Sequence, residues 1–183
     1  MDLQNKLFKN DEYPPSEDTF FLVDYIEKIS GQNALDIGSG SGYITKLLWE
    51  NFAFVVGTDI NLPVLQNQSS YKTRNLVCCS GSDAILANFD LIVCNLPYLA
   101  TDEIIDIATD GGKDGFEIPK IIFDSVKLVM SEKTRFVFVT SSLSDFQKLS
   151  DYWIDLGYDA KIVSKKKLFF EELILIEVSG KNN

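Results

Sequence analysis

Short apolar runs alternate with segments of helical periodicity along most of this chain, and this alternation limits the fold to few architectures. The runs have the length of buried strands, and the segments between them place apolar residues three and four positions apart. The expected strands are 34–37, 52–58, 75–79, 89–94 and 135–140, and the expected helices are 19–29, 43–51, 62–67, 119–130 and 143–156, with a short helix at 103–108. Strands that are each followed by a helix form a parallel sheet covered on both faces. The sequence therefore predicts an α/β fold.

Two further runs, 158–163 and 172–178, follow the last helix with no helix between them. Strands joined so directly are antiparallel. We therefore expect a seven-stranded, mostly parallel sheet that ends in a C-terminal antiparallel hairpin. No repeat, low-complexity segment or linker interrupts the 183 residues, so we expect one domain over 1–183.

The net charge of −10 and the lack of a long apolar run limit the partners. An acidic surface repels phosphate backbones, so we expect no direct contact with nucleic acid. No apolar run approaches the ~20 residues of a membrane span. Residues 1–6 also lack the apolar core of a secretory signal. The composition thus predicts a cytoplasmic protein that does not enter a membrane.

Cysteine and histidine content argues against a metal site. The chain has no histidine, and Cys78, Cys79 and Cys94 lack the spacing of metal ligands. We expect three buried thiols in a reducing compartment. A basic cluster at Lys161 and 165–167 is expected to be a solvated loop, with a docking patch for an acidic or RNA-bearing partner as the alternative.

The segment D-I-G-S-G-S-G at 36–42 joins the first predicted strand to the next helix. Glycines in such a turn let backbone N–H groups approach a ligand without an intervening Cβ. The positions Gly38, Gly40 and Gly42, with Ser39 between the first two, depart from the G-x-G-x-x-G spacing of dinucleotide-binding loops. Asp36 places a carboxylate where it can reach an ammonium-bearing ligand.

Acidic turns also end the second and third strands. Asp59, followed by Ile60, stands where an acid binds a ribose hydroxyl pair. Ser82 and Asp83 follow the third strand, where a carboxylate can accept from an adenine amino group. The three strand ends fit S-adenosylmethionine better than a dinucleotide. A generic nucleotide-binding sheet, or glycines that serve only a turn, are the alternatives.

The tetrapeptide N-L-P-Y at 95–98 follows the fourth strand and should face the same crevice. An amide or aromatic amine is a poor nucleophile because its lone pair is delocalised. The Asn95 side-chain oxygen and the Leu96 carbonyl can accept its two N–H bonds and hold it in place. Pro97 biases Leu96 toward an extended backbone, and Tyr98 can stack on the planar group. No histidine is needed if positioning and desolvation supply the acceleration.

These motifs resemble a known family. N-L-P-Y resembles the (N/D)-P-P-Y motif of methyltransferases that modify planar nitrogens. The segment Y-P-P-S-E-D-T-F at 13–20 is similar to the E-P-x-E-D-T-F segment of HemK2-type enzymes, the eukaryotic and archaeal branch of the HemK family. G-G-K-D-G-F-E at 111–117 matches the G-G-x-x-G-x-E loop of that branch, and E-E-L-I-L-I at 171–176 resembles its closing E-x-L strand.

The resemblance implies a Rossmann-like class I methyltransferase that methylates the side-chain amide of the glutamine in the GGQ loop of class 1 translation release factors. Glu17 and Thr19 would help to close the cofactor pocket around S-adenosylmethionine, and Asn95 would belong to both the cofactor and the acceptor site. A small zinc-binding activator commonly forms a heterodimer with such enzymes along an edge strand, and the strand at 75–79 would be that edge.

Leu96 departs from the family pattern, because N-L-P-Y is typical of enzymes that dimethylate adenine in ribosomal RNA. The carbonyl of residue 96 survives the change, so amide chemistry remains. The acidic charge and the short chain favour protein glutamine over adenine N6 of RNA or DNA, with other nitrogens as a third class. A non-catalytic S-adenosylmethionine-binding partner protein is a further alternative.

Overall fold

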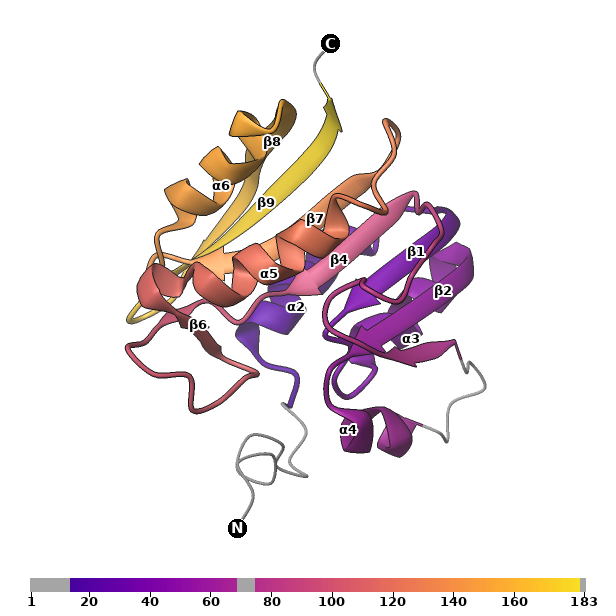
Figure 1. The fold of residues 1–183 in the computed structure, drawn as a ribbon, viewed down its shortest axis with the longest axis horizontal. Coiled ribbons are helices and arrows are strands. Elements are labelled where there is room, and N and C mark those ends of the chain that lie inside the picture. Colours follow the sequence, from indigo (N-terminus) through magenta and orange to yellow (C-terminus); the bar gives the residue numbers. More distant parts are fainter. Residues whose placement is uncertain (1–13, 69–74, 182–183) are drawn as a thin grey trace.

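A computed structural model of the chain describes residues 14–68 and 75–181, and its main feature is a seven-stranded sheet in the order β3-β2-β1-β4-β7-β9-β8 (Figure 1). The strands are β1 (Gly31–Ile37), β2 (Phe52–Asp59), β3 (Leu76–Cys78), β4 (Leu91–Asn95), β7 (Arg135–Ser141), β8 (Tyr158–Lys167) and β9 (Glu172–Lys181). The strands from β3 to β7 in this order run parallel, and β9 is antiparallel to both β7 and β8. The predicted sheet and its C-terminal hairpin are confirmed. Tyr13, the first residue of the Y-P-P-S-E-D-T-F segment, lies outside the described ranges.

Five α-helices lie among the described residues. They are α2 (Glu17–Ile26), α3 (Tyr43–Asn51), α4 (Leu62–Asn67), α5 (Glu117–Val126) and α6 (Phe146–Asp155). α2 precedes β1, and the other four lie between strands. α3 and α4 have the predicted bounds, whereas α2 begins and ends earlier than predicted and α5 and α6 are shorter. α6 begins at Phe146 because the carboxylate of Asp145 accepts a hydrogen bond from the Lys148 backbone N–H at 3.1 Å, which caps the helix.

Two hydrophobic layers cover the sheet. Alternate residues of a strand point to opposite faces. Phe136 and Phe138 of β7 therefore pack against Phe123 of α5 and Trp153 of α6, while Val137 and Val139 face α2 and α3. Phe123 lies within 6 Å of both strand aromatics, with ring centroids 5.8 and 5.0 Å apart. The core thus holds the carboxyl ends of the parallel strands at one edge of the sheet.

The predicted helix at 103–108 is wrong. A two-stranded sheet of β5 (Leu99–Ala100) and β6 (Asp110–Gly112) brackets this segment, and the short 3-10 helix η2 (Lys113–Gly115) follows it. Backbone N–H groups of Ile105 and Asp106 donate to the Asp110 carboxylate, both at 2.8 Å. That carboxylate closes a turn and removes the donors a helix would use.

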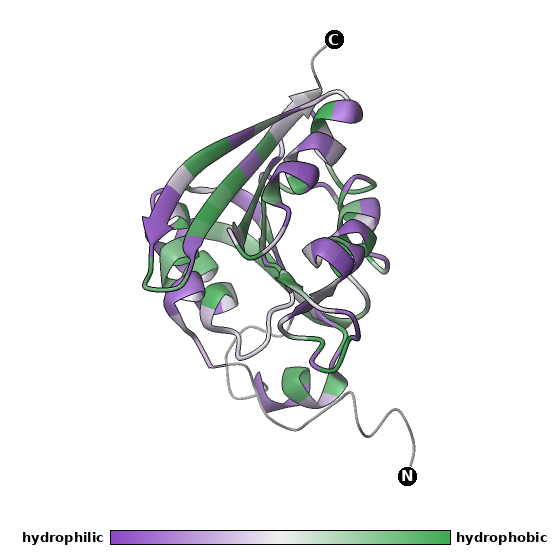
Figure 2. Cartoon of the chain, turned by 90° about the vertical axis from the view of Figure 1, so that its left-hand side faces the viewer, coloured by the Kyte–Doolittle hydropathy of each residue, from purple (hydrophilic) through white to green (hydrophobic). Residues whose placement is uncertain are grey.

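The lysine cluster lies on β8, so the prediction of a loop is wrong, although Lys161, Lys165 and Lys167 are exposed to solvent as predicted. Lys165 pairs with Glu172 at 2.9 Å and Lys166 with Glu17 at 2.7 Å. Figure 2 shows hydrophilic and hydrophobic residues alternating along this hairpin. Beyond β8, the side chains of Phe169 and Phe170 are 92% and 86% exposed at the tip of the hairpin.

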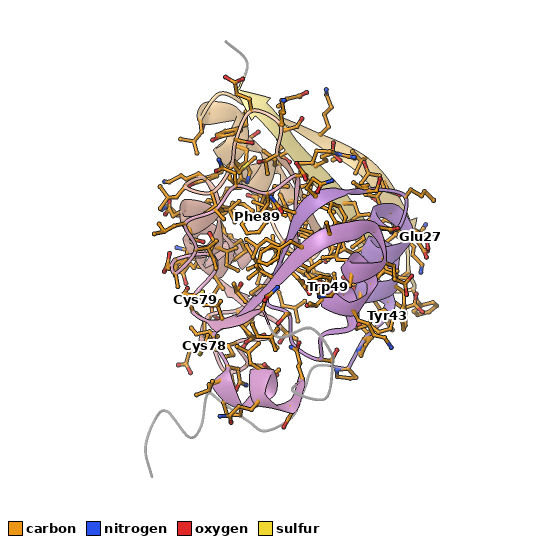
Figure 3. The ribbon with its side chains drawn as sticks, turned by 90° about the vertical axis from the view of Figure 1, so that its right-hand side faces the viewer. Glu27, Tyr43, Trp49, Cys78, Cys79 and Phe89 are labelled. Atoms are coloured by element: carbon orange, nitrogen blue, oxygen red, sulfur yellow. The ribbon has the colours of Figure 1, made fainter. Side chains whose placement is uncertain are left out.

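Only part of the thiol prediction is correct. Cys94 is buried and Cys79 half-buried, but Cys78 is exposed at the end of the outermost strand, where Figure 3 labels it. No group of three potential metal ligands occurs within residues 14–68 and 75–181. In the same residues, no helix has both the length and the apolar character required to cross a lipid bilayer.

Candidate active site

The glycine loop after β1 has a backbone that requires glycine. Gly38, Gly40 and Gly42 have φ values of 70°, 49° and 77°, in the left-handed region that L side chains rarely adopt. The Ser39 N–H donates to the Thr58 carbonyl of β2 at 2.8 Å, which fastens the loop to the next strand. The loop therefore stands at the carboxyl ends of β1 and β2.

A glutamine that the sequence did not single out holds this loop. The side-chain amide of Gln68 donates to Ser39 Oγ at 3.1 Å and to the Gly40 carbonyl, and Gln68 is 3% exposed. A Cβ on Gly42 would lie 2.6 Å from Gln68 Oε1, so this glycine also makes room for the clamp. No sequence signal marks Gln68, because it follows α4 without any motif.

Asp59 ties the loop to the turn after β2. One carboxylate oxygen accepts from the Gly40 N–H at 2.9 Å, and the other accepts from the Asn61 N–H at 2.8 Å. Burial raises the pKa of this carboxyl above its usual range. Asp59 and its neighbour Ile60 both line the cavity described below.

Asp36 lies behind the loop, and it is not among the residues that line the cavity. The side chain is 1% exposed, and one oxygen accepts from the Thr45 hydroxyl at 2.6 Å. The other oxygen is buried and has no hydrogen-bond partner among the described residues. Loss of hydration raises the pKa of Asp36 to about 7. A nearby cation would lower this pKa again and ionise the group.

A cavity of about 380 Å³ opens between the glycine loop, the end of β4 and the start of α5. That volume lies in the range of small-molecule sites, roughly 300–1,000 Å³. Among the described residues that line this cavity, Asp59 is the one with a charged side chain. The other lining residues are apolar or polar without charge. A cavity with a carboxylate and no lysine or arginine suits a cationic ligand and disfavours the phosphates of a dinucleotide.

Asn95 ends β4 and lines the cavity with Thr19, Pro97 and Pro15. Its side-chain N–H₂ group donates to Thr19 Oγ at 3.4 Å. Its side-chain oxygen is buried and has no hydrogen-bond partner among the residues described. A residue that lines the cavity thus carries a buried acceptor, and a buried acceptor without a partner is expected to bind a donor from a ligand.

The other members of the tetrapeptide have different environments. Leu96 is 1% exposed and packs in the core cluster with Phe123 and Phe138, away from the cavity. The Tyr98 ring is 9% exposed and packs with Phe21 and Leu173 in the opposite core cluster. Neither Leu96 nor Tyr98 is among the residues lining the cavity, so the structure does not place the Tyr98 ring there to stack on an acceptor as predicted. The tetrapeptide is therefore anchored in both hydrophobic layers of the fold.

The G-G-K-D-G-F-E segment supports this tetrapeptide directly. A Cβ on Gly111 would lie 2.7 Å from the Pro97 carbonyl, and a Cβ on Gly115 would lie 2.3 Å from the Tyr98 carbonyl. Leu99 also donates its N–H to the Thr109 carbonyl at 2.9 Å. The glycines are needed because the two backbones pack with no space for a side chain.

Four of the predicted cofactor residues are not among those lining the cavity: Asp36, described above, and Glu17, Ser82 and Asp83. The Glu17 side chain is 62% exposed and pairs with Lys166. Asp83 is exposed in the turn after β3, and Ser82 is buried beside Ser125, whose hydroxyl accepts from the Ser82 N–H at 2.9 Å. By contrast, Gly81, next to Ser82, does line the cavity.

Several known proteins are similar to this chain in sequence. A family profile described as a methyltransferase domain matches residues 35–104. The chain is 30% identical to human methyltransferase HEMK2 over 72% of each protein. It is 27% identical to the eRF1 methyltransferase catalytic subunit mtq2 of Schizosaccharomyces pombe, over 92% of this chain and 89% of that protein.

A solved structure shows the same architecture. The E. cuniculi Mtq2-Trm112 complex, responsible for the methylation of the eRF1 translation termination factor, contains a chain that superposes with a TM-score of 0.78 at 25% identity. The match covers 92% of this chain and 98% of that chain. The predicted Rossmann-like class I methyltransferase fold is confirmed by this agreement.

Proposed function

This chain belongs to the HemK2 family of methyltransferases, and on that premise we propose that it transfers a methyl group from S-adenosylmethionine to the side-chain amide nitrogen of the GGQ glutamine in a class 1 translation termination factor. The observation that carries the proposal is the buried side-chain oxygen of Asn95, a residue that lines the cavity; this oxygen has no hydrogen-bond partner within residues 14–68 and 75–181. A primary amide is a donor of the kind that this acceptor requires.

The residues around the cavity fit S-adenosylmethionine. The left-handed turns at Gly38 and Gly40 leave their backbone free of side chains, and a Cβ on Gly38 would meet nothing within 4 Å. Asp59 supplies the carboxylate for the ribose hydroxyls, and Asp36 adds negative charge beneath the loop. When bound, this cofactor supplies an electrophilic methyl group on a sulfonium ion.

The chain's own residues position and desolvate the acceptor amide. Asn95 and the Leu96 carbonyl accept its two N–H bonds, which fixes the nitrogen and raises its electron density. Pro97 restricts the backbone of Leu96 to extended conformations. Tyr98 contributes by anchoring the tetrapeptide, because its ring packs in the core. A monomethylated amide has lost one N–H, so we expect a single methyl group per glutamine.

A labelled-methyl assay tests the substrate. We expect label on a class 1 termination factor and none on its variant with GGQ changed to GGA, with mass spectrometry showing one added methyl. Label that persists on the GGA form would exclude this glutamine. Label found on RNA instead would establish the adenine alternative, which the N-L-P-Y form of the motif favours.

Asn95→Ala separates an enzyme from a non-catalytic binding protein. The buried acceptor disappears, so we expect methyl transfer to fall by about 10²-fold or more, the magnitude typical of a lost transition-state hydrogen bond. Cofactor affinity by calorimetry should change little. Unaltered methyl transfer would contradict the role of Asn95.

We also propose that a small zinc-binding activator pairs with the β3 edge of the sheet. β3 (Leu76–Cys78) is an edge strand without charged residues, whereas the opposite edge strand, β8, carries four lysines, Lys161 and 165–167. Lysines on an edge strand oppose pairing with another strand. The β3 edge is therefore the better surface for a partner.

Copurification tests this edge. Cys78→Lys adds a charge to the exposed end of β3, and we expect it to abolish recovery of the activator after coexpression. Ile162→Lys is the matched control, because Ile162 is 42% exposed on the opposite edge strand. Loss of the activator with the control variant, but not with Cys78→Lys, would place the partner on β8.

A further inference from the structure

The E-D-T-F segment contains an aspartate to which no role has yet been assigned. Asp18 lies in the first turn of α2 and is 6% exposed, and Thr19 beside it is 5% exposed. One oxygen of Asp18 accepts three hydrogen bonds, from the Ser16 hydroxyl at 2.6 Å, the Thr19 N–H at 2.6 Å and the Thr19 hydroxyl at 3.2 Å. A buried carboxylate thus holds the hydroxyl of a residue that lines the cavity.

This arrangement determines what Thr19 can offer to Asn95. A threonine hydroxyl has one proton, and here that proton is donated to the Asp18 carboxylate. Toward Asn95, Thr19 Oγ can then act only as an acceptor. The Asn95 amide must present its N–H₂ group to Thr19, as observed at 3.4 Å, and its oxygen must point the other way.

We propose that Asp18 is a positioning residue that fixes the orientation of the Asn95 amide through Thr19. The relay, meaning the hydrogen bonds from Asn95 to Thr19 and from Thr19 to Asp18, leaves the Asn95 oxygen as an acceptor for N–H groups. That oxygen has no hydrogen-bond partner among the described residues. If the amide rotated by half a turn, its N–H₂ group would oppose the N–H₂ group of the acceptor, and two donors repel. The relay rests on the proposed function and specifies that the acceptor nitrogen carries hydrogen.

Asp18 also supports the start of α2, so the test must separate orientation from folding. In Asp18→Asn the side-chain oxygen can still accept from Thr19, whereas Asp18→Ala removes the acceptor. Thr19→Ser keeps a hydroxyl and Thr19→Val removes it at nearly unchanged volume. Each disruptive change is therefore paired with a conservative one at the same position.

The experiment measures kcat for methyl transfer to the termination factor and the Kd of S-adenosylmethionine for the four variants, well below their unfolding temperatures. We expect Asp18→Ala and Thr19→Val to lower kcat about tenfold or more, the effect of misorienting one hydrogen-bonding group. Asp18→Asn should retain a higher kcat than Asp18→Ala, and Thr19→Ser a higher kcat than Thr19→Val. Because Thr19 lines the cavity, Kd is measured for each variant, and the fall in kcat of the two disruptive variants should exceed their change in Kd.

Two results would overturn the relay. One is a kcat for Asp18→Ala and Thr19→Val that equals the kcat of their conservative partners. The other is a fall in kcat only in proportion to weaker cofactor binding, which indicates a structural role in the pocket. If the wild-type protein leaves the termination factor unlabelled, the proposed function fails, whereas active wild type with equally active Asp18→Ala refutes only the relay.

Discussion

Gly115→Ala should damage the acceptor site without touching the cavity. Gly115 has φ +66°, and a Cβ there would lie 2.3 Å from the Tyr98 carbonyl oxygen. Contacts under 3.0 Å do not occur for real Cβ atoms, so one backbone must move by at least about 0.7 Å. The moving carbonyl belongs to the N-L-P-Y tetrapeptide, which also contains Asn95.

Gly115→Ala should lower the free energy of unfolding for two reasons. A left-handed conformation costs an alanine about 1–2 kcal/mol, and overpacking adds about 1–3 kcal/mol. Gly157→Ala is the matched control, since Gly157 has φ +84° and a Cβ there meets nothing within 4 Å. The two variants share the first cost, so the difference in their stability isolates the contacts that a Cβ at position 115 would make with the Tyr98 carbonyl and, at 2.7 Å, with Ser144 Cβ.

Differential scanning calorimetry and initial rates of methyl transfer measure both effects. At about 2–4 °C per kcal/mol, the melting temperature of Gly115→Ala should lie about 2–12 °C below that of Gly157→Ala. A displacement near 1 Å can lower kcat by up to about 10²-fold. Cofactor affinity should be the same for both. Equal melting temperatures, with wild-type kcat in both variants, would refute the proposed support of the tetrapeptide by this loop.

Three further predictions concern the cofactor side of the site. Folding raises the pKa of Asp36 from 3.8 to about 7, so its contribution to the free energy of unfolding is present below pH 4 and is lost as pH rises to about 7. This decline amounts to up to about 4 kcal/mol, and in urea unfolding without ligand it should be absent from Asp36→Asn. Parallel pH profiles of stability for the two proteins would contradict this prediction. Asp59→Ala should weaken S-adenosylmethionine binding about tenfold or more. It should also lower the free energy of unfolding by about 1–3 kcal/mol, because the Gly40 and Asn61 N–H groups lose their acceptor. Unaltered affinity in calorimetry would exclude Asp59 from the cofactor site. Gln68→Leu should weaken the same affinity about fivefold, because the glycine loop loses its clamp, and unchanged affinity would make the clamp irrelevant to binding.

The elements with strong periodicity could be predicted from the sequence. The bounds of α3 and α4 were predicted correctly because each lies between a glycine or asparagine turn and a clear change of pattern. β5 and β6 were missed, since strands of two or three residues are too short to show any periodicity. The helix expected at 103–108 failed because the Asp110 carboxylate, outside that window, takes up its N–H groups.

The site was harder to predict than the fold, because direction matters there as well as position. Sequence placed Asn95 and Asp59 at strand ends, and both line the cavity. Glu17 was expected near the cofactor, but the ion pair with Lys166, 149 residues away in the sequence, draws it to β8. Partners so distant cannot be read from a local motif. Gln68 illustrates the opposite case, a side chain that contacts the site and belongs to no motif.

The burial of Leu96 bears on how such motifs are used to classify sequences. Its side chain lies in the hydrophobic core, in one cluster with Phe123 and Phe138, and Leu96 is not among the residues that line the cavity. The choice between leucine and proline here is then subject to selection for core packing rather than for the methyl acceptor. The residue at position 96 can therefore differ between subfamilies whose core packing differs. If position 96 were used to separate glutamine methyltransferases from adenine methyltransferases, the separation would reflect differences in core packing. The residues at the cavity-lining positions 95 and 97 are better suited to this purpose.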